Sequence, residues 1–237
     1  MVELKGKKIA DSGFYINLEK RTDRKNNIES QLHKLGLVGV ERFNAITSLR
    51  SPQLGCNKSH YTLFENFIKT DGEVLLVLED DCLFLDVIYE ESDEIINDIF
   101  SVEWDIFWLG CKNRRSPLPN KNNTYFTTST SHAQSYLIKK KLCEHILNTY
   151  PFDSLNNILI DELLCLSMYG PDVVRYPNKY NFYNLENPYD VMERKFISLC
   201  YDESLTTQYN SYSDLWNHSN DYEKYITQGY PNKRKRT

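Results

Sequence analysis

The chain has 237 residues, of which 41% are hydrophobic and 13% aromatic, so most of its length can bury a core and intrinsic disorder is excluded there. A net charge of −5 supplies no global basic surface, which argues against a dedicated nucleic-acid binder. Six widely spaced cysteines without a C-x-x-C pair, and an opening segment without an apolar core, lead us to expect a reducing, cytoplasmic setting.

Strand and helix signals alternate from the beginning of the chain. Residues 14–18 are apolar enough for a first strand. A helix follows, because Ile28, Leu32 and Leu35 recur at helical spacing and Gly36 supplies a stop.

The next stretch predicts a short strand at residues 40–45 and then a helix. Asn57 or Ser59 is expected to cap that helix, whose apolar face includes residues 63–68. Residues 74–78 (VLLVL) are uniformly apolar, as in a strand that is buried on both faces of a parallel sheet.

The same alternation continues through the second half of the chain. We expect helices at residues 88–100, 141–150 and 156–168, strands at 105–110, 133–138 and 173–176, and a polar loop or flap at 112–130. This order predicts an α/β fold with a largely parallel sheet flanked by helices. We expect the domain to cover residues 1–186, with a C-terminal appendage at 187–237 that ends in a basic run at 233–236.

Three acids, Glu79, Asp80 and Asp81, directly follow the buried strand at residues 74–78. Open α/β sheets bind ligands beyond the carboxyl ends of their strands. Carboxylate oxygens there suit Mg²⁺ or Mn²⁺ with a phosphate-bearing substrate. The alternative is that these acids only begin the next turn or cap a helix.

A second candidate cluster follows the first predicted strand, and consists of Asn17, Arg21, Asp23 and Arg24. Two guanidinium groups can bind a diphosphate, and a short acid can hydrogen-bond a ribose or a base. An ordinary charged turn that caps the following helix explains the same residues.

Two further clusters have polar residues at predicted helix starts or strand ends. Ser59 and His60 would lie near a helix N-terminus, which attracts phosphate or sugar oxygens, although a lone histidine is more often a core residue. His132 is grouped with Asp161 and Glu162, either of which suits a general base or a simple helix cap.

The motifs together resemble glycosyltransferase family 25, in the family's order along the chain. The matching segments are residues 14–24 (FYINLEKRTDR), 42–45 (RFNA), 55–60 (GCNKSH), 76–81 (LVLEDD), 104–110 (WDIFWLG), 132–138 (HAQSYLI) and 160–162 (IDE). A Gly-rich stretch often precedes the family's His-Ala pair, whereas this chain has Thr and Ser there.

The resemblance implies a GT-A-like fold and an inverting transfer of a hexose from a UDP-sugar, with Mn²⁺ or Mg²⁺. It implies the following roles: Glu79 and Asp81 bind the metal; Asn17, Arg21, Asp23, Arg24, Ser59, His60, Asp80 and His132 bind the donor; and Asp161, or second Glu162, is the catalytic base.

The expected partners are the nucleotide-sugar donor and a glycan or hydroxylated protein acceptor, without nucleic acid. Membrane contact is expected to be at most peripheral, through residues 233–236. A nucleotidyltransferase is disfavoured, because no Gly-rich phosphate loop follows Leu18. A catalytically inactive sugar- or protein-binding module on the same fold is the remaining alternative.

Overall fold

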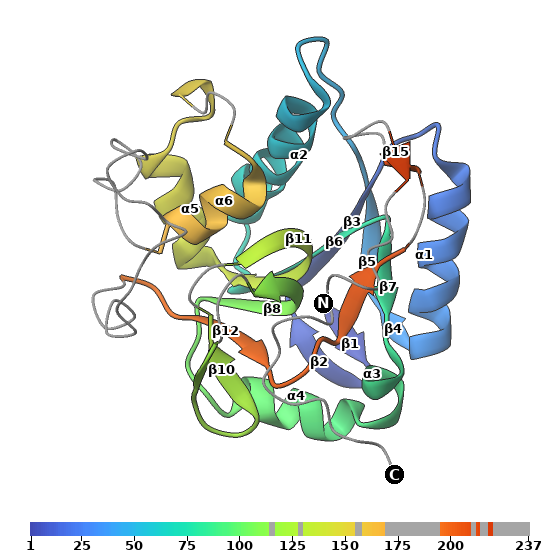
Figure 1. Ribbon diagram of the computed structural model, residues 1–237, viewed down its shortest axis with the longest axis vertical. Helices are drawn as coiled ribbons and strands as arrows, with labels where there is room; N and C mark the ends of the chain where they lie inside the picture. Colours follow the sequence, from blue (N-terminus) through green and yellow to red (C-terminus); the bar gives the residue numbers. More distant parts are fainter. Residues whose placement is uncertain are drawn as a thin grey trace.

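A computed structural model describes residues 1–113, 117–127, 130–154, 158–168, 195–209, 212–213 and 218–219. Its central feature is an eight-stranded sheet in the order β5-β3-β6-β11-β8-β12-β10-β9, with helices on both faces (Figure 1). The strands of this sheet are β3 Ser12–Asn17, β5 Val40–Asn44, β6 Val74–Glu79, β8 Ile106–Asn113, β9 Leu118–Pro119, β10 Thr124–Phe126, β11 Thr130–Lys139 and β12 Ser198–Tyr201.

Smaller sheets and the helices complete the described part of the chain. The remaining strands are β1 Val2–Leu4, β2 Lys7–Ala10, β4 Leu37–Val38, β7 Cys82–Phe84, β13 Thr206–Gln208, β14 Tyr212–Ser213 and β15 His218–Ser219. The helices are α1 Thr22–Leu35, α2 Pro52–Phe67, α3 Asp86–Glu90, α4 Ser92–Phe100, α5 Lys140–Thr149, α6 Ile160–Leu166 and the 3₁₀ turn η1 Phe152–Ser154. Within the described ranges, no helix combines the length and apolarity of a membrane span.

Strand β6 separates two hydrophobic cores. Leu76 and Leu78 pack with residues of α1, α3 and α4, whereas Leu75 and Val77 pack with residues of α2, α5 and α6. Figure 1 shows these two sets of helices on opposite sides of the sheet. Because side chains alternate between the faces of a strand, the uniformly apolar run fills both cores. The predicted α/β class and doubly buried strand are confirmed.

The sheet is mixed but largely parallel in direction. Strands β5, β3 and β6 are parallel neighbours, and β8 and β12 are another parallel pair. Strand β11 runs antiparallel to both β6 and β8, and β10 runs antiparallel to β12 and β9. Six of the eight strands therefore point the same way, and only β10 and β11 are reversed.

Several predicted elements differ from the structure in extent. The helix predicted at residues 88–100 is broken at Glu91, where the backbone leaves helical geometry between α3 and α4. The predicted flap at residues 112–130 is wrong in part, because β9 and β10 form an antiparallel pair there. The strand predicted at 173–176 lies outside the described residues.

The central sheet continues into the C-terminal part of the chain. Strand β12 lies between β8 and β10, and Trp108 Nε1 donates to Ser198 Oγ at 2.9 Å. The division of the chain at residue 187 stays a prediction, but Ser198–Tyr201 belongs to the central sheet. The basic run at 233–236 lies outside the described residues.

Candidate active site

The carboxyl ends of β3 and β6 bring two of the predicted clusters together. These strands are parallel neighbours, with Ile16 opposite Glu79, and the Asp80 N–H donates to the Ile16 carbonyl at 3.1 Å. Asn17 Nδ2 then donates to Asp80 Oδ2 at 2.7 Å. Residues 63 positions apart in the sequence thus share one corner of the sheet.

Arg24 reaches this corner from the first turn of α1. Its Nη1 donates to Asp80 Oδ1 at 2.9 Å and to Asp81 Oδ2 at 3.2 Å, and its side chain is only 10% exposed. Both Asp80 oxygens are therefore occupied by Arg24 and Asn17. Burial raises the pKa of Asp80, and the charge and hydrogen bond of Arg24 oppose that shift. This arrangement fixes Asp80 and directs Arg24 toward Asp81.

Asp81 is the least satisfied acid of the corner. Within the described residues, its Oδ1 is buried without a hydrogen-bond partner. Burial raises the pKa of Asp81 to about 7, the Glu79 carboxylate adds to the shift, and Arg24 opposes it. A buried carboxylate oxygen without a donor is a suitable ligand for a hard divalent cation.

Arg42 is a site residue that the sequence reasoning did not assign. It lies on β5 opposite Tyr15 of β3, and its Nε donates to Asn17 Oδ1 at 2.9 Å. The signal was present in the matching segment at residues 42–45, where a charged residue interrupts a short strand. Arg42 therefore adds a third guanidinium group near the corner.

Arg21 and Asp23 are positioned differently from Arg24. Arg21 Nη2 pairs with Asp23 Oδ2 at 2.8 Å, and Asp23 is well exposed. The pKa of Asp23 is lowered to about 2, mainly by the hydrogen bond from Arg21. These two residues pair with each other at the start of α1, and their proposed contact with a nucleotide stays a prediction.

The helix start predicted at Asn57 or Ser59 is wrong. Helix α2 begins at Pro52, and Ser51 caps it by accepting the Leu54 N–H, so residues 55–60 lie inside the helix and not at its N-terminus. Ser59 Oγ is buried, donates to the Gly55 carbonyl at 2.9 Å and accepts the Ile46 N–H at 2.8 Å. Ser59 thus joins α2 to the segment before it, and a contact with the donor stays a prediction.

Gly55 explains why that segment can approach α2. A Cβ at this position would lie 2.6 Å from the Ile46 carbonyl oxygen and 3.2 Å from the Ser48 N. The glycine of the GCNKSH segment therefore permits a close backbone approach within the protein.

We expect Gly55→Ala to lower the free energy of unfolding by about 1–3 kcal/mol through this overlap. The sign of the stability change is informative, because a helix interior favours alanine over glycine by about 1 kcal/mol. Without the overlap, the substitution would therefore stabilise the protein. Urea unfolding measures the change, with the exposed α2 substitution Lys58→Ala as the control. A Gly55→Ala protein more stable than wild type would contradict the close approach.

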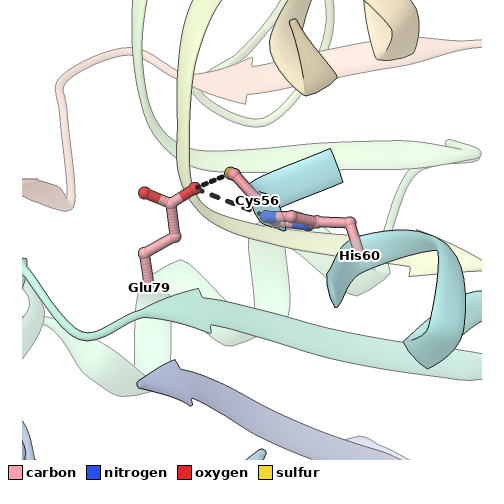
Figure 2. A group of neighbouring side chains, drawn as sticks. All are labelled: Cys56, His60 and Glu79. Atoms are coloured by element: carbon pink, nitrogen blue, oxygen red, sulfur yellow. Dashed lines mark hydrogen bonds and ion pairs between the residues drawn. The ribbon is translucent and has the colours of Figure 1, made fainter. Parts of the chain in front are cut away.

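His60 and Glu79 meet between α2 and the end of β6 (Figure 2). His60 Nε2 lies 3.4 Å from Glu79 Oε1, and Cys56 Sγ lies 3.9 Å from the same oxygen. His60 Nδ1 is 2.7 Å from the Tyr136 hydroxyl. Cys56 was not predicted as a site residue, although its spacing of four from His60 places both on one face of a helix.

The electrostatics of Cys56 connect the two ends of the site. Burial is the largest cause that raises the pKa of its thiol well above the usual value. The negative charges of Glu79, Asp161, Asp81 and Asp80 add to this shift. All four carboxylates therefore act electrostatically on this one thiol. The acidic triplet and the start of α6 belong to the same region.

His132 and Asp161 meet at an irregularity in β11. The pairing of β11 with β8 shifts between Ser131 and Ser135, and His132 has a φ of 70°. The His132 N–H donates to Asp161 Oδ2 at 2.9 Å, and Asp161 Oδ1 accepts the Glu162 N–H. Glu162 Oε2 accepts the Leu159 N–H at 3.4 Å, which caps α6. The fourth predicted cluster is thus assembled in the fold.

Comparisons with known proteins agree with the sequence motifs. The family model described as "Glycosyltransferase family 25 (LPS biosynthesis protein)" matches residues 47–164. The chain is 24% identical over 187 residues to procollagen galactosyltransferase 1-B of Xenopus laevis, which covers 65% of this chain and 30% of that protein. It is 22% identical over 209 residues to procollagen galactosyltransferase 2 of Homo sapiens, with 74% and 33% covered. The chain spans about a third of the length of these relatives.

Solved structures show weaker similarity. The inositol-1-phosphate CTP transferase from T. maritima gives a TM-score of 0.38 at 15% identity, and covers 83% of this chain and 66% of that one. A putative glucose-1-phosphate thymidylyltransferase from Bacillus anthracis gives a TM-score of 0.34 at 14% identity, with 63% and 61% covered.

Proposed function

Because this chain belongs to glycosyltransferase family 25, we propose that it transfers a hexose from a UDP-sugar to a hydroxyl group, with inversion at the anomeric carbon. The acceptor is a glycan or a hydroxylated protein. Galactose is the first donor sugar to test and glucose the second, since the relatives are named galactosyltransferases.

The observation that carries the proposal is the corner where β3 and β6 end. Asn17, Arg24, Asp80 and Asp81 form one connected set of hydrogen bonds there, at the edge where α/β sheets bind ligands. Arg42 supplies positive charge for a diphosphate beside the corner, and Arg24 already offsets the charge of Asp80. The corner therefore suits a nucleotide diphosphate better than an arbitrary charged turn would.

The proposal includes Mn²⁺ or Mg²⁺ bound by Asp81 and Glu79. The residues fit such an ion, because Asp81 Oδ1 is a buried oxygen that lacks a partner within the described residues and Glu79 is partly exposed beside it. When bound, the ion would offset the negative charge that develops on the diphosphate leaving group. Arg24 keeps the Asp81 carboxylate oriented.

Asp161 is proposed as the base that accepts the acceptor proton, with Glu162 as the second candidate. Each Asp161 oxygen already accepts one backbone N–H, which fixes the carboxylate. Each carboxylate oxygen has two lone pairs, so one on each remains for the acceptor hydroxyl. His132 positions Asp161 through its backbone N–H.

Transfer and its stereochemistry test this function. The protein is incubated with UDP-galactose or UDP-glucose, Mn²⁺, and either a hydroxylysine peptide or a lipooligosaccharide fragment. Proton NMR of the product should show the anomeric configuration opposite to that of the donor. A product that retains the configuration would contradict the inverting mechanism.

Metal affinity should depend on pH in a predictable direction. Since burial raises the pKa of Asp81 to about 7, a bound ion must displace a proton below that pH. We expect Mn²⁺ affinity to fall up to about tenfold per pH unit below 7 and to level off above it. Calorimetric titrations at several pH values measure this, and an affinity that is constant from pH 5 to 8 would contradict it.

A further inference from the structure

We propose that Cys56, His60 and Glu79 form a binding site for a transition-metal ion of the Zn²⁺ class. Figure 2 shows the three side chains converging, two from α2 and one from the end of β6. Their ligand atoms all lie within 4.8 Å of one another. The proposal adds a second kind of ion to the acidic region described above.

The distances suit a single ion between the three groups. Glu79 Oε1 lies 3.9 Å from Cys56 Sγ and 3.4 Å from His60 Nε2. Metal bonds of about 2.3 Å to sulfur and about 2.0 Å to nitrogen or oxygen separate tetrahedral ligand atoms by roughly 3.5 Å. Only small side-chain movements are therefore needed to bind the ion.

Tyr136 holds the imidazole in a suitable orientation. Its hydroxyl lies 2.7 Å from His60 Nδ1, both side chains are fully buried, and their rings stack. A ligating histidine usually has its second ring nitrogen hydrogen-bonded in this way. The Nε2 atom is left facing Glu79 and Cys56. Without a metal, His60 Nε2 and Glu79 Oε1 make only a long histidine–carboxylate contact.

The ligand types determine which ion is expected. A thiolate and an imidazole favour Zn²⁺ or Co²⁺, whereas the oxygen ligands at Asp81 favour Mg²⁺ or Mn²⁺. The second Glu79 oxygen points away from the Cys56–His60 pair in Figure 2. If Glu79 also serves the donor metal, Zn²⁺ should inhibit transfer; this consequence alone rests on the proposed function.

A cobalt titration tests the site without any sugar donor. The reduced, chelator-treated full chain should bind one equivalent of Co²⁺ with a thiolate-to-cobalt charge-transfer band in the near ultraviolet. Zn²⁺ should remove the band, and excess Mg²⁺ should not. Cys56→Ser should abolish the band, whereas Cys143→Ala, which removes a buried thiol on α5, should retain it.

Glu79→Gln provides a second variant, for which we expect Co²⁺ affinity to fall at least about tenfold. Circular dichroism confirms that each variant is folded. No charge-transfer band in the wild type, or a band that survives Cys56→Ser, would overturn the proposal. An intact cobalt band in a protein that transfers no sugar would instead contradict the proposed function alone.

Discussion

Asp81→Asn is expected to lower metal-dependent sugar transfer by roughly 10²–10³-fold, the loss typical when one electrostatic stabiliser of a transition state is removed. Asp81 Oδ1 is a buried oxygen that has no hydrogen-bond partner within the described residues, and an amide cannot supply the same charge to a cation. Initial rates of UDP release with UDP-galactose and Mn²⁺ measure the effect. Asp93→Asn, at an exposed acid paired with Lys7, is the control.

The same substitution should stabilise the metal-free protein at neutral pH. Asp81 has a pKa of about 7 in the native state and an ordinary acid pKa near 4 when unfolded, so the native state binds more protons between these values. Stability contributed by this group therefore falls as pH rises from about 4 to 7. A higher melting temperature for Asp81→Asn at pH 8 is the expected result. An Asp81→Asn protein that retains wild-type transfer would contradict the role of Asp81.

Arg24→Met should cost about 3–5 kcal/mol of unfolding free energy, because it leaves two buried carboxylates without their cation. Urea unfolding measures the loss. The matched control is Lys25→Met on the same helix, whose contact with Glu29 is 3.9 Å long between half-exposed side chains. The control should change stability by less than about 1 kcal/mol.

A double substitution separates the charge effect from lost packing. Arg24→Met combined with Asp81→Asn removes one uncompensated carboxylate as well as the guanidinium, so it should recover part of the loss. Equal destabilisation by Arg24→Met and Lys25→Met would contradict the buried ion pairs, as would a double variant that recovers nothing.

Local patterns in the sequence predict much of the fold. The run at residues 74–78 indicates a strand buried on both faces, and the structure places alternate residues of β6 in two cores. Gly36 indicates the end of α1, where it adopts a left-handed conformation. The start of α2 is also encoded locally, because Ser51 is a capping residue and Pro52 follows it in the first turn of the helix.

Contacts between distant segments account for what the sequence could not show. The antiparallel pairing of β10 with β12 joins Thr124 to Tyr201. No local periodicity encodes that pairing, so residues 112–130 resembled a loop. The irregularity that brings the His132 N–H to Asp161 likewise depends on the register between β11 and β8.

The candidate site likewise combines features that the sequence predicts with contacts that it does not predict. The sequence placed acids and guanidinium groups at strand ends, and the fold confirms that these ends are adjacent. It could not show that Arg24 would bind Asp80 and Asp81, whereas Arg21 would turn to Asp23. Nor could it show that Cys56 would face Glu79, since that contact depends on how α2 packs against β6.

The most direct test of the central claim is binding and hydrolysis of UDP-galactose by the wild-type chain, with and without Mn²⁺. We predict Mn²⁺-dependent binding and slow release of galactose, both of which are lost in Asp81→Asn. A panel of other UDP-sugars identifies the donor if UDP-galactose is neither bound nor hydrolysed. A folded protein that binds no nucleotide-sugar in either condition would contradict the transferase and favour an inactive binding module.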